Sequence, residues 1–496
     1  MIKMKKILLL ALLVGFINAF SQGYKISVQI KGAPKDSLCQ LAYYFGEKKL
    51  LQDSARVLDS KGNFVFEGKE KLSKGIYLIV APDGRYFDFV VNDATHFSMK
   101  TDTSDYVKNM TFEGSPENVL FYRYLNYITP ISKQIGIKSE EYKKIKDSNP
   151  NKAEELLTEL RAMDKQLVDY KKNFIVEHPE TFAAVLFKSM EDVPIIDAPA
   201  GMPDSLVQNF KYQYFKKHYF DNIDFKDERM LRTPVFEGKV DYYLDKLVAQ
   251  HWDSLIKESN YLLNEKVGKG NYGMFRYMLN HLTSKYGESK IMCMDEVPWY
   301  LYKNYYLVDS RVDWIDSTQR VKLEEEVAKK RYNLCGDVPP NIFFRDTLGN
   351  NFPLHSVKAE YTVVYFWSAT CGHCKKATPK LWEYYKKVKD KGVEVYTICI
   401  DKDDKEYKKF INKYGFTWIN TRDDDKKNMD MFASTHAYRT CYNVFSTPTI
   451  YILDKDKKII GKKVDVDIVK KILNDKLGLP QEKEEAEEEK EDGHKH

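Results

Sequence analysis

One segment constrains the fold of this chain more than any other: a run of β-branched and aromatic residues that leads into two closely spaced cysteines. The run spans Thr362–Phe366, and a Cys-Gly-His-Cys motif follows at 371–374. Residues Lys375–Lys389 then have the apolar spacing of a helix. A buried strand that leads into a Cys-x-x-Cys motif at the start of a helix is a far stronger signal than the cysteine spacing alone. The segment therefore predicts an α/β fold with a redox-active dithiol.

The position of the motif gives different roles to its two cysteines. Cys371 would lie at the N-terminus of the helix, where unpaired backbone N–H groups and the positive end of the helix dipole stabilise an anion. We therefore expect Cys371 to be the exposed nucleophile with a low pKa. Cys374, one turn further along, is expected to be buried and to attack second. His373 places an imidazole beside the thiolate and is expected to tune its pKa.

The rest of the chain divides into regions of different pattern. Residues 22–112 contain short alternating runs between turn residues, which predicts a β-sandwich, whereas the apolar spacing of 113–333 predicts a helical domain. Residues 334–477 alternate strands and helices, and 478–496 form an acidic tail that we expect to be disordered. The predicted fold class is multidomain α+β with an α/β C-terminal domain. Strands are expected at Tyr24–Lys31, Leu38–Tyr44, Asn63–Glu67, Gly75–Ala81, Tyr86–Val91, His96–Lys100, Val393–Ile400 and Thr449–Leu453.

The first 21 residues have the features of a signal peptide. Lysines precede the apolar run Ile7–Phe20, and Ala19-Phe20-Ser21 is a small-x-small cleavage site before Gln22. The apolar run is too short to span a bilayer. We therefore expect a cleaved leader and a soluble, periplasmic chain. Disulfides persist in that compartment, which favours redox chemistry over zinc binding for the dithiol.

Composition excludes two classes of protein. The 78 basic and 73 acidic residues nearly balance, which gives no sign of a nucleic-acid-binding protein. With 43% hydrophobic and 14% aromatic residues, the chain has ample apolar surface to fold. Seven cysteines are too few for a disulfide-stapled framework, and their number is odd. Of the five outside the motif, Cys399 is expected to be a packed core thiol, and Cys39 likewise falls in a strand. A redox role is left open at Cys441, and Cys293 and Cys335, in and at the edge of the helical region, are given no role.

The dithiol segment resembles that of the thioredoxin fold, and more closely that of the exported TlpA/ResA-type thiol–disulfide oxidoreductases, which are also grouped with redoxins and AhpC/TSA proteins. Three further stretches carry the resemblance. Gly336–Ile342 with Asp346–Gly349 is similar to the opening hairpin of the family, Tyr442–Thr449 to its cis-proline segment, and Ile452–Asp454 to the strand and turn that follow. Residues 22–333 resemble uncharacterised modules that are fused to such redoxins in Gram-negative bacteria.

The resemblance implies a site and its partners. Cys371 would exchange disulfides with protein thiols and disulfides, and Cys374 would resolve the mixed disulfide, with no metal and no cofactor. Thr447 and a cis Pro448 would dock a substrate strand. Trp367, which matches a tryptophan of the family, is also assigned to substrate binding. A separate membrane or periplasmic protein would supply or accept electrons.

Three positions depart from the family pattern. Thr370 stands where a tryptophan is common before the first cysteine. Tyr365 takes the place of the buried acid of thioredoxins, and Ala377 that of the glutamate of ResA-type proteins. The usual proton acceptor for the second cysteine is therefore missing, and its replacement is left open among His373, a lysine such as Lys375, and water.

The sequence thus predicts an exported thiol–disulfide oxidoreductase, and two alternatives stay open. The first makes residues 22–333 a binding scaffold, with the redoxin as a minor or vestigial module. The second is a thiol peroxidase, against which the peroxiredoxin pattern argues: it has proline where Val364 stands and threonine where Ser368 stands. The substrate, the electron partner and the direction of electron transfer stay open at this point.

Overall fold

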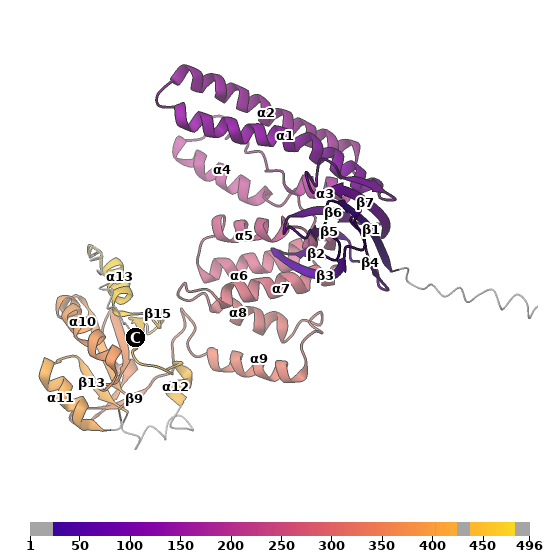
Figure 1. Cartoon of the computed structure of the whole chain (residues 1–496). Coiled ribbons are helices and arrows are strands. Elements are labelled where there is room, and N and C mark those ends of the chain that lie inside the picture. The colour runs from indigo at the N-terminus through magenta and orange to yellow at the C-terminus, as the bar shows by residue number, and fades with distance from the viewer. Residues whose placement is uncertain (1–22, 402, 424–436, 482–496) are drawn as a thin grey trace, which may run out of the picture. The chain divides into compact units, whose positions relative to one another are not determined.

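The computed structural model describes residues 23–401, 403–423 and 437–481 (Figure 1). The chain divides into two compact units, which are described separately below. The first comprises Met1–Ala249 and Leu262–Tyr277, and the second comprises Gln250–Tyr261 and Met278–His496. The predicted signal peptide and most of the predicted acidic tail lie outside the described residues. Within the described ranges, no helix combines the length and the apolar character that a bilayer crossing requires.

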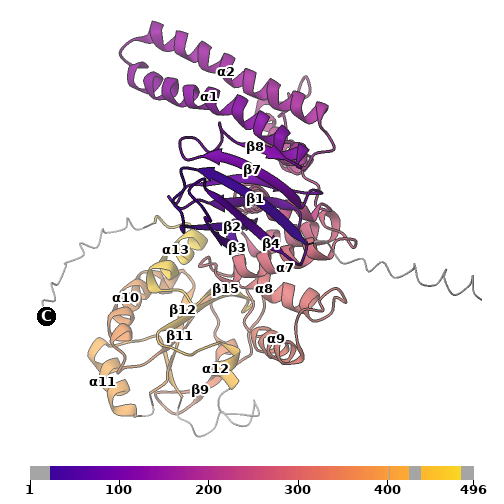
Figure 2. The same cartoon turned by 45° about the vertical axis from the view of Figure 1, so that its right-hand side comes forward.

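The first unit begins with two four-stranded sheets (Figure 2). Their strands are β1 (Tyr24–Lys31), β2 (Leu38–Phe45), β3 (Lys48–Arg56), β4 (Asn63–Gly68), β5 (Gly75–Val80), β6 (Tyr86–Val91), β7 (His96–Asp102) and β8 (Thr111–Glu113). One sheet has the order β4-β1-β7-β8 and the other β3-β2-β5-β6, and only β1 and β7 pair in parallel. Alternate residues of β1, such as Ile26 and Val28, are buried, as in a sheet with one face toward a core. Six of these strands begin at the residues predicted from the sequence, which does not predict β3 or β8.

Helices follow the sheets in the first unit. α1 begins at Pro116 after its N-cap residue Ser115, and α2 begins at Pro150. Proline suits the first position of a helix because the N–H that it lacks would be unpaired there. An aromatic cluster joins the first three helices, with the rings of Tyr124 and Phe187 centred 4.1 Å apart. The elements are α1 (Pro116–Ile145), α2 (Pro150–Glu177), α3 (Phe182–Ser189), α4 (Asp204–His218), η1 (Glu228–Arg232) and α5 (Phe236–Lys246); η2 (Tyr261–Lys266) and α7 (Tyr272–Gly287) are divided between the units.

The second unit contains a thioredoxin-like domain built on a seven-stranded sheet. Its helices before the sheet are α6 (Trp252–Asn260), α8 (Glu296–Leu301), η3 (Tyr302–Tyr306) and α9 (Ser317–Lys330). The sheet domain contains β9 (Phe343–Asp346), β10 (Asn351–Pro353), η4 (Leu354–Ser356), β11 (Tyr361–Trp367), α10 (Gly372–Val388), η5 (Lys389–Lys391), β12 (Val393–Cys399), α11 (Asp404–Tyr414), β13 (Ile419–Arg422), α12 (Ala437–Cys441), β14 (Thr449–Asp454), β15 (Ile459–Lys462) and α13 (Val466–Leu477). The strand order is β10-β9-β13-β12-β11-β14-β15, and β12 pairs in parallel with both β11 and β13.

Two apolar clusters cover the opposite faces of this sheet. Alternate residues of β11 contribute to each, Tyr365 and Trp367 to one and Val364 and Phe366 to the other. The first cluster includes side chains of α10, α11 and α13, and the second includes side chains of β9 and α12. A strand that is covered on both faces must be apolar throughout. This explains why the sequence of β11 is a continuous run of β-branched and aromatic residues instead of an alternating pattern. The second cluster also includes residues before the sheet, among them Cys293 and Cys335.

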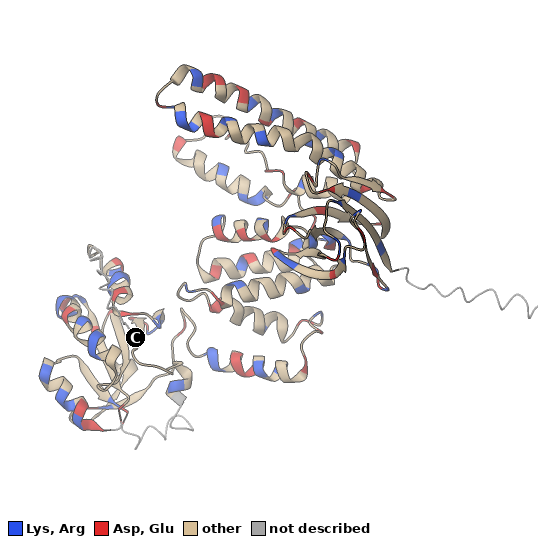
Figure 3. Ribbon diagram, viewed as in Figure 1, with Lys and Arg blue, Asp and Glu red and all other residues tan. Residues whose placement is uncertain are grey.

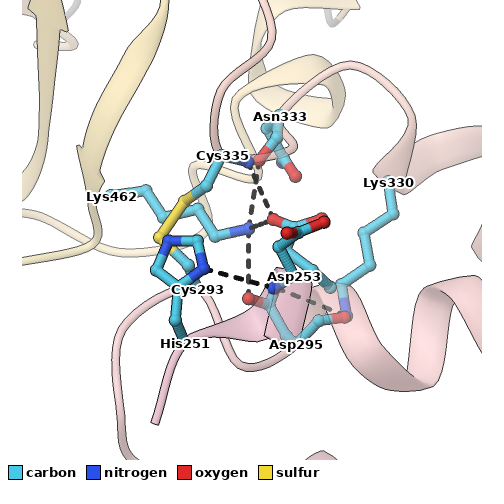
Figure 4. Close-up of a disulfide and its surroundings, with 9 residues drawn as sticks. His251, Asp253, Cys293, Asp295, Lys330, Asn333, Cys335 and Lys462 are labelled. Carbon is cyan, nitrogen blue, oxygen red and sulfur yellow. Dashed lines mark hydrogen bonds and ion pairs between the residues drawn. A yellow bond between two sulfur atoms is a disulfide. The ribbon is translucent and has the colours of Figure 1, made fainter. Parts of the chain in front are cut away.

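A disulfide joins Cys293 to Cys335, which are 42 residues apart in the sequence (Figure 4). Neither cysteine is given a role or a partner from the sequence. Beside the bridge, the ammonium of Lys462 in β15 lies 2.6 Å from the carboxylate of Glu296 at the start of α8. These two side chains are only 5% and 4% exposed, so the ion pair is buried.

Further hydrogen bonds satisfy this buried pair. Glu296 accepts a hydrogen bond from the backbone N–H of Cys335, and Lys462 donates to the carbonyl oxygen of Asn333. Lys462 also lies 3.1 Å from the carboxylate of Asp295. A buried ion pair stabilises a fold only when its remaining polar atoms have such partners. The helical segment before the sheet is therefore tied to the thioredoxin-like domain by one covalent bond and one fully satisfied ion pair.

Removing the bridge should measurably destabilise the second unit. Because the disulfide closes a loop of 42 residues, we expect Cys293→Ser combined with Cys335→Ser to lower the free energy of unfolding by about 4 kcal/mol. Denaturant titration followed by tryptophan fluorescence measures this loss. Each single variant should lose nearly as much as the double variant, since all three lack the same bond. Losses that simply add across the two single variants would contradict the bridge.

Candidate active site

The dithiol lies where the central strand of the thioredoxin-like sheet meets a helix. β11 ends at Trp367, and α10 begins at Gly372 with Cys371 as its N-cap residue. Because β11 and β12 pair in parallel, their carboxyl ends meet at the same edge of the sheet. Residues that follow the two strands can therefore contact one another beside the motif.

The thiol of Cys371 is held where an anion is favoured. It is partly buried, and it donates a hydrogen bond to the carbonyl oxygen of Thr447 at 3.3 Å. The backbone N–H of Cys374 donates to the Cys371 sulfur and lowers the pKa of this thiol below its ordinary value, although partial burial opposes the shift. The hydrogen bond from the Cys374 N–H is one part of the stabilisation that the N-terminus of a helix gives to an anion.

The second cysteine is in a different environment. Cys374 is fully buried, and burial raises the pKa of its thiol to about 11. The backbone N–H of Ser368 donates to the Cys374 sulfur at 3.5 Å and partly offsets this effect. One sulfur is thus accessible and acidic, whereas its neighbour is enclosed and protonated. Sequential attack by the two cysteines of a dithiol needs this asymmetry.

The cis-proline segment faces the dithiol. The Thr447–Pro448 peptide bond is cis, and the Thr447 carbonyl is the group that contacts Cys371. Both residues are partly buried. Phe445, two residues earlier, has 84% of its surface exposed. The structure therefore brings together four of the residues assigned from the sequence, Cys371, Cys374, Thr447 and Pro448.

The structure corrects the assignment of Trp367. Its side chain is completely buried, and its ring packs against those of Tyr407 and Phe410 in α11. Because Trp367 alternates with Phe366 along β11, its side chain points into the apolar cluster under α10 and α11. A side chain in this position cannot contact a protein substrate, so we remove Trp367 from the substrate-binding residues.

The start of α10 is basic. His373 is exposed between the two cysteines, and Lys375 and Lys376 are exposed immediately after them. The first turn of this helix contains no acidic residue, and blue segments, which mark Lys and Arg, are seen along α10 in Figure 3. Positive charge beside a thiolate favours the anion.

Two groups of contacts near the dithiol involve residues that the sequence analysis does not assign. The hydroxyl of Tyr365 hydrogen-bonds that of Thr378 at 2.8 Å, in the same buried cluster as Cys374. The carboxylate of Asp401, after β12, accepts a hydrogen bond from the hydroxyl of Ser368, after β11. Polar residues directly after two parallel strands, such as Ser368 and Asp401, are expected to meet when those strands are neighbours in the sheet. The sequence could predict this contact only if the strand order were already known.

The other thiols lie in apolar surroundings. Cys399 is fully buried in the core, as the sequence predicts, and burial raises the pKa of its thiol to about 12. Burial also raises the pKa values of Cys39, to about 11, and of Cys441. Burial and a raised pKa disfavour the thiolate form of all three cysteines, so their surroundings do not favour a nucleophilic role.

Comparisons with known proteins agree with this geometry. Residues 335–462 match the AhpC/TSA family, and two domains of unknown function, DUF4369 and DUF5106, match residues 24–121 and 193–333. The chain is 30% identical over 133 residues to the thiol-disulfide oxidoreductase ResA of Bacillus anthracis, which covers 27% of this chain and 71% of the relative. It is 25% identical over 144 residues to ResA of Bacillus subtilis, which covers 29% of this chain and 74% of the relative.

Solved structures also resemble parts of the chain. A domain of a possible thiol-disulfide isomerase from Cytophaga hutchinsonii is 35% identical, with a TM-score of 0.26, over 29% of this chain and 92% of that domain. A thioredoxin-like protein from Bacteroides caccae is 18% identical, with a TM-score of 0.40, over 57% of this chain and 98% of its own.

The lowered pKa of Cys371 predicts selective alkylation. In the reduced, folded Cys374→Ser variant, iodoacetamide should modify Cys371 first. Because the helix N-terminus favours the thiolate, the rate should reach half its maximum at a lower pH than in the same variant unfolded in urea, where the pKa returns to about 8.5. Mass spectrometry of peptides locates the label and gives the rates. Equal midpoints in the folded and unfolded chains would show that the fold does not activate Cys371.

Proposed function

The chain belongs to the family of ResA-type thiol–disulfide oxidoreductases through its C-terminal domain, and from this we propose that it is an exported enzyme that exchanges disulfides with protein substrates through Cys371 and Cys374. One observation carries the proposal. The accessible Cys371 thiol, whose pKa is lowered, lies against the carbonyl of Thr447 while Cys374 is enclosed directly behind it.

The reaction follows from the different environments of the two sulfurs. The Cys371 thiolate attacks one sulfur of a substrate disulfide, the other substrate sulfur leaves as a thiolate, and a mixed disulfide forms. Cys374 then loses its proton and attacks the Cys371 sulfur, which releases the second substrate thiolate and leaves the Cys371–Cys374 disulfide. The substrate gains two electrons and the dithiol loses two. The reverse sequence oxidises a substrate dithiol.

The segment before the cis-proline supports a docking role. We assign Thr447 and Pro448 to substrate binding, because the carbonyl of Thr447 already accepts a hydrogen bond from the thiol of Cys371, the reacting residue. Phe445 adds an exposed aromatic surface next to this segment. His373, exposed between the cysteines, is assigned to tuning the Cys371 thiolate. A separate membrane or periplasmic protein exchanges electrons with the dithiol.

For the remaining regions we propose the organisation predicted from the sequence. Two four-stranded sheets between Tyr24 and Glu113 support a β-sandwich, and the helices between Pro116 and Lys330 support a helical domain. Residues 250–261 and 278–333 of this helical region share a compact unit with the thioredoxin-like domain. Only this part of the helical region is assigned to the unit of the redox domain, and its other helices belong to the first unit.

The proposed export can be tested at the N-terminus. Expressed in a Gram-negative host, the full chain should be recovered from the periplasm with Gln22 as its first residue, because the leader ends in a small-x-small site. N-terminal sequencing of the periplasmic fraction checks this. A charged residue in the middle of the apolar run, Leu12→Arg, should hold the precursor in the cytoplasm. A chain that keeps Met1 and stays in the cytoplasm would contradict export.

The proposed exchange can be tested by trapping. Cys374→Ser should accumulate mixed disulfides between Cys371 and protein substrates, because the resolving thiol is absent. Non-reducing electrophoresis followed by mass spectrometry identifies the adducts. The matched control is the double variant Cys371→Ser with Cys374→Ser, which should trap nothing. Absence of adducts from cells, together with no disulfide exchange by the purified wild-type chain, would remove the proposal.

A further inference from the structure

We propose that Asp401 is a positioning residue of the dithiol: its carboxylate holds the loop between β11 and α10 through Ser368, and so fixes the N–H groups around both cysteines. The inference rests on the proposed function of Cys371 and Cys374 and adds a residue to their machinery. Asp401 follows β12 and lies 30 residues after Cys371 in the sequence. Only the parallel pairing of β11 with β12 brings it to the motif.

The carboxylate of Asp401 accepts several hydrogen bonds from this loop. The hydroxyl of Ser368 donates to Oδ1 at 2.6 Å, and the backbone N–H of Ala369 donates to Oδ2 at 2.6 Å. The hydroxyl of Thr370 lies 3.4 Å from Oδ1, and the thiol of Cys399 lies 3.5 Å from Oδ2. The short connection between β11 and α10 is thus attached at three successive residues to the residue that follows β12.

Ser368, which Asp401 holds in place, is hydrogen-bonded to both cysteines. Its hydroxyl oxygen accepts hydrogen bonds from the backbone N–H groups of Thr370 and Cys371, each at 3.2 Å. Its own backbone N–H donates to the Cys374 sulfur at 3.5 Å. The position of Ser368 therefore determines both where α10 begins and how well the buried sulfur is solvated.

The chemistry of the contacts requires a carboxylate. All the partners of Asp401 in this network are donors, and an ionised carboxylate accepts through both oxygens. An asparagine has the same shape but only one accepting oxygen. In either orientation of the side chain, its NH₂ group would face one of the two donors, the Ser368 hydroxyl or the Ala369 N–H. Asp401→Asn thus removes the anchor with little change in volume.

Asp401 could act by positioning the loop or only through its negative charge, and these two roles predict opposite effects of Asp401→Asn on the cysteines. A carboxylate near two thiols disfavours their ionisation, so if Asp401 acted through its charge alone, Asp401→Asn would make both cysteines ionise more readily and react faster. If Asp401 positions Ser368, the same variant loosens the N–H donors and slows the reaction of Cys374. The loss of one such hydrogen bond corresponds to about fivefold in rate.

The two steps can be separated with 5,5′-dithiobis(2-nitrobenzoic acid) and the reduced full-length chain. Attack by Cys371 releases one thionitrobenzoate and leaves a mixed disulfide on Cys371. Attack by Cys374 on the Cys371 sulfur then releases the second. We expect Asp401→Asn to slow the second release about fivefold to tenfold relative to wild type. Asp403→Asn is the matched control: this acid caps α11 through the N–H of Lys405, and the second release should keep the wild-type rate.

A double-mutant cycle tests the route through Ser368. Ser368→Ala should also slow the second release, and adding Asp401→Asn to it should cost less than in the wild-type background, because the two residues share one link. Ser368→Ala leaves the end of β12 intact and serves alone if Asp401→Asn does not fold, as judged by thermal unfolding. An unchanged or faster second release in Asp401→Asn, an unchanged rate in Ser368→Ala, or fully additive effects would each overturn the inference. The reagent replaces the protein substrate, so a failed exchange assay with proteins would remove the proposed function and leave this test standing.

Discussion

The proposed active site depends on one interaction, the hydrogen bonding of the Cys371 sulfur at the first N–H groups of α10. Those groups have no partner within the helix, and their combined dipoles favour negative charge. The backbone N–H of Cys374 is the main cause of the lowered Cys371 pKa, so the helix that carries the second cysteine activates the first. Everything that fixes the start of this helix, from the buried strand β11 to the cis-proline segment, therefore acts on the reactivity of one atom.

The buried side of the site has an unusual composition. Tyr365 stands where thioredoxins have a buried acid, and its hydroxyl is paired with that of Thr378. Burial raises the pKa of Tyr365, so the pair stays neutral. On this side Cys374 lies beside a neutral pair, and burial, together with the neighbouring Cys371 sulfur, raises the pKa of its thiol. The carboxylate of this site belongs instead to Asp401, which bonds the loop at Ser368 and Ala369. Asp401 is partly buried, and the donors of the loop hydrogen-bond both oxygens of its carboxylate.

The sequence predicts what is local and misses what depends on topology. The run Thr362–Phe366 and the motif after it specify β11 and the start of α10, because burial on both faces and the cysteine spacing leave one arrangement. β3 is missed since it is an edge strand with mostly exposed residues and no alternation. Trp367 is misassigned because a family position does not say toward which face of β11 its side chain points. Asp401 and the Cys293–Cys335 bridge are missed because residues far apart in sequence meet only once the strands are ordered.

The chain carries two sulfur pairs whose accessibility differs, and this difference lets them coexist. Thiol–disulfide exchange requires a thiolate to approach a disulfide sulfur directly. Cys293 and Cys335 are both buried, next to the ion pair of Lys462 and Glu296, so a dithiol such as Cys371–Cys374 on another copy cannot reach their bond without local unfolding. Cys371, in contrast, is only partly buried beside an exposed segment. Burial therefore separates the buried bridge from the pair that we propose to react, within one polypeptide.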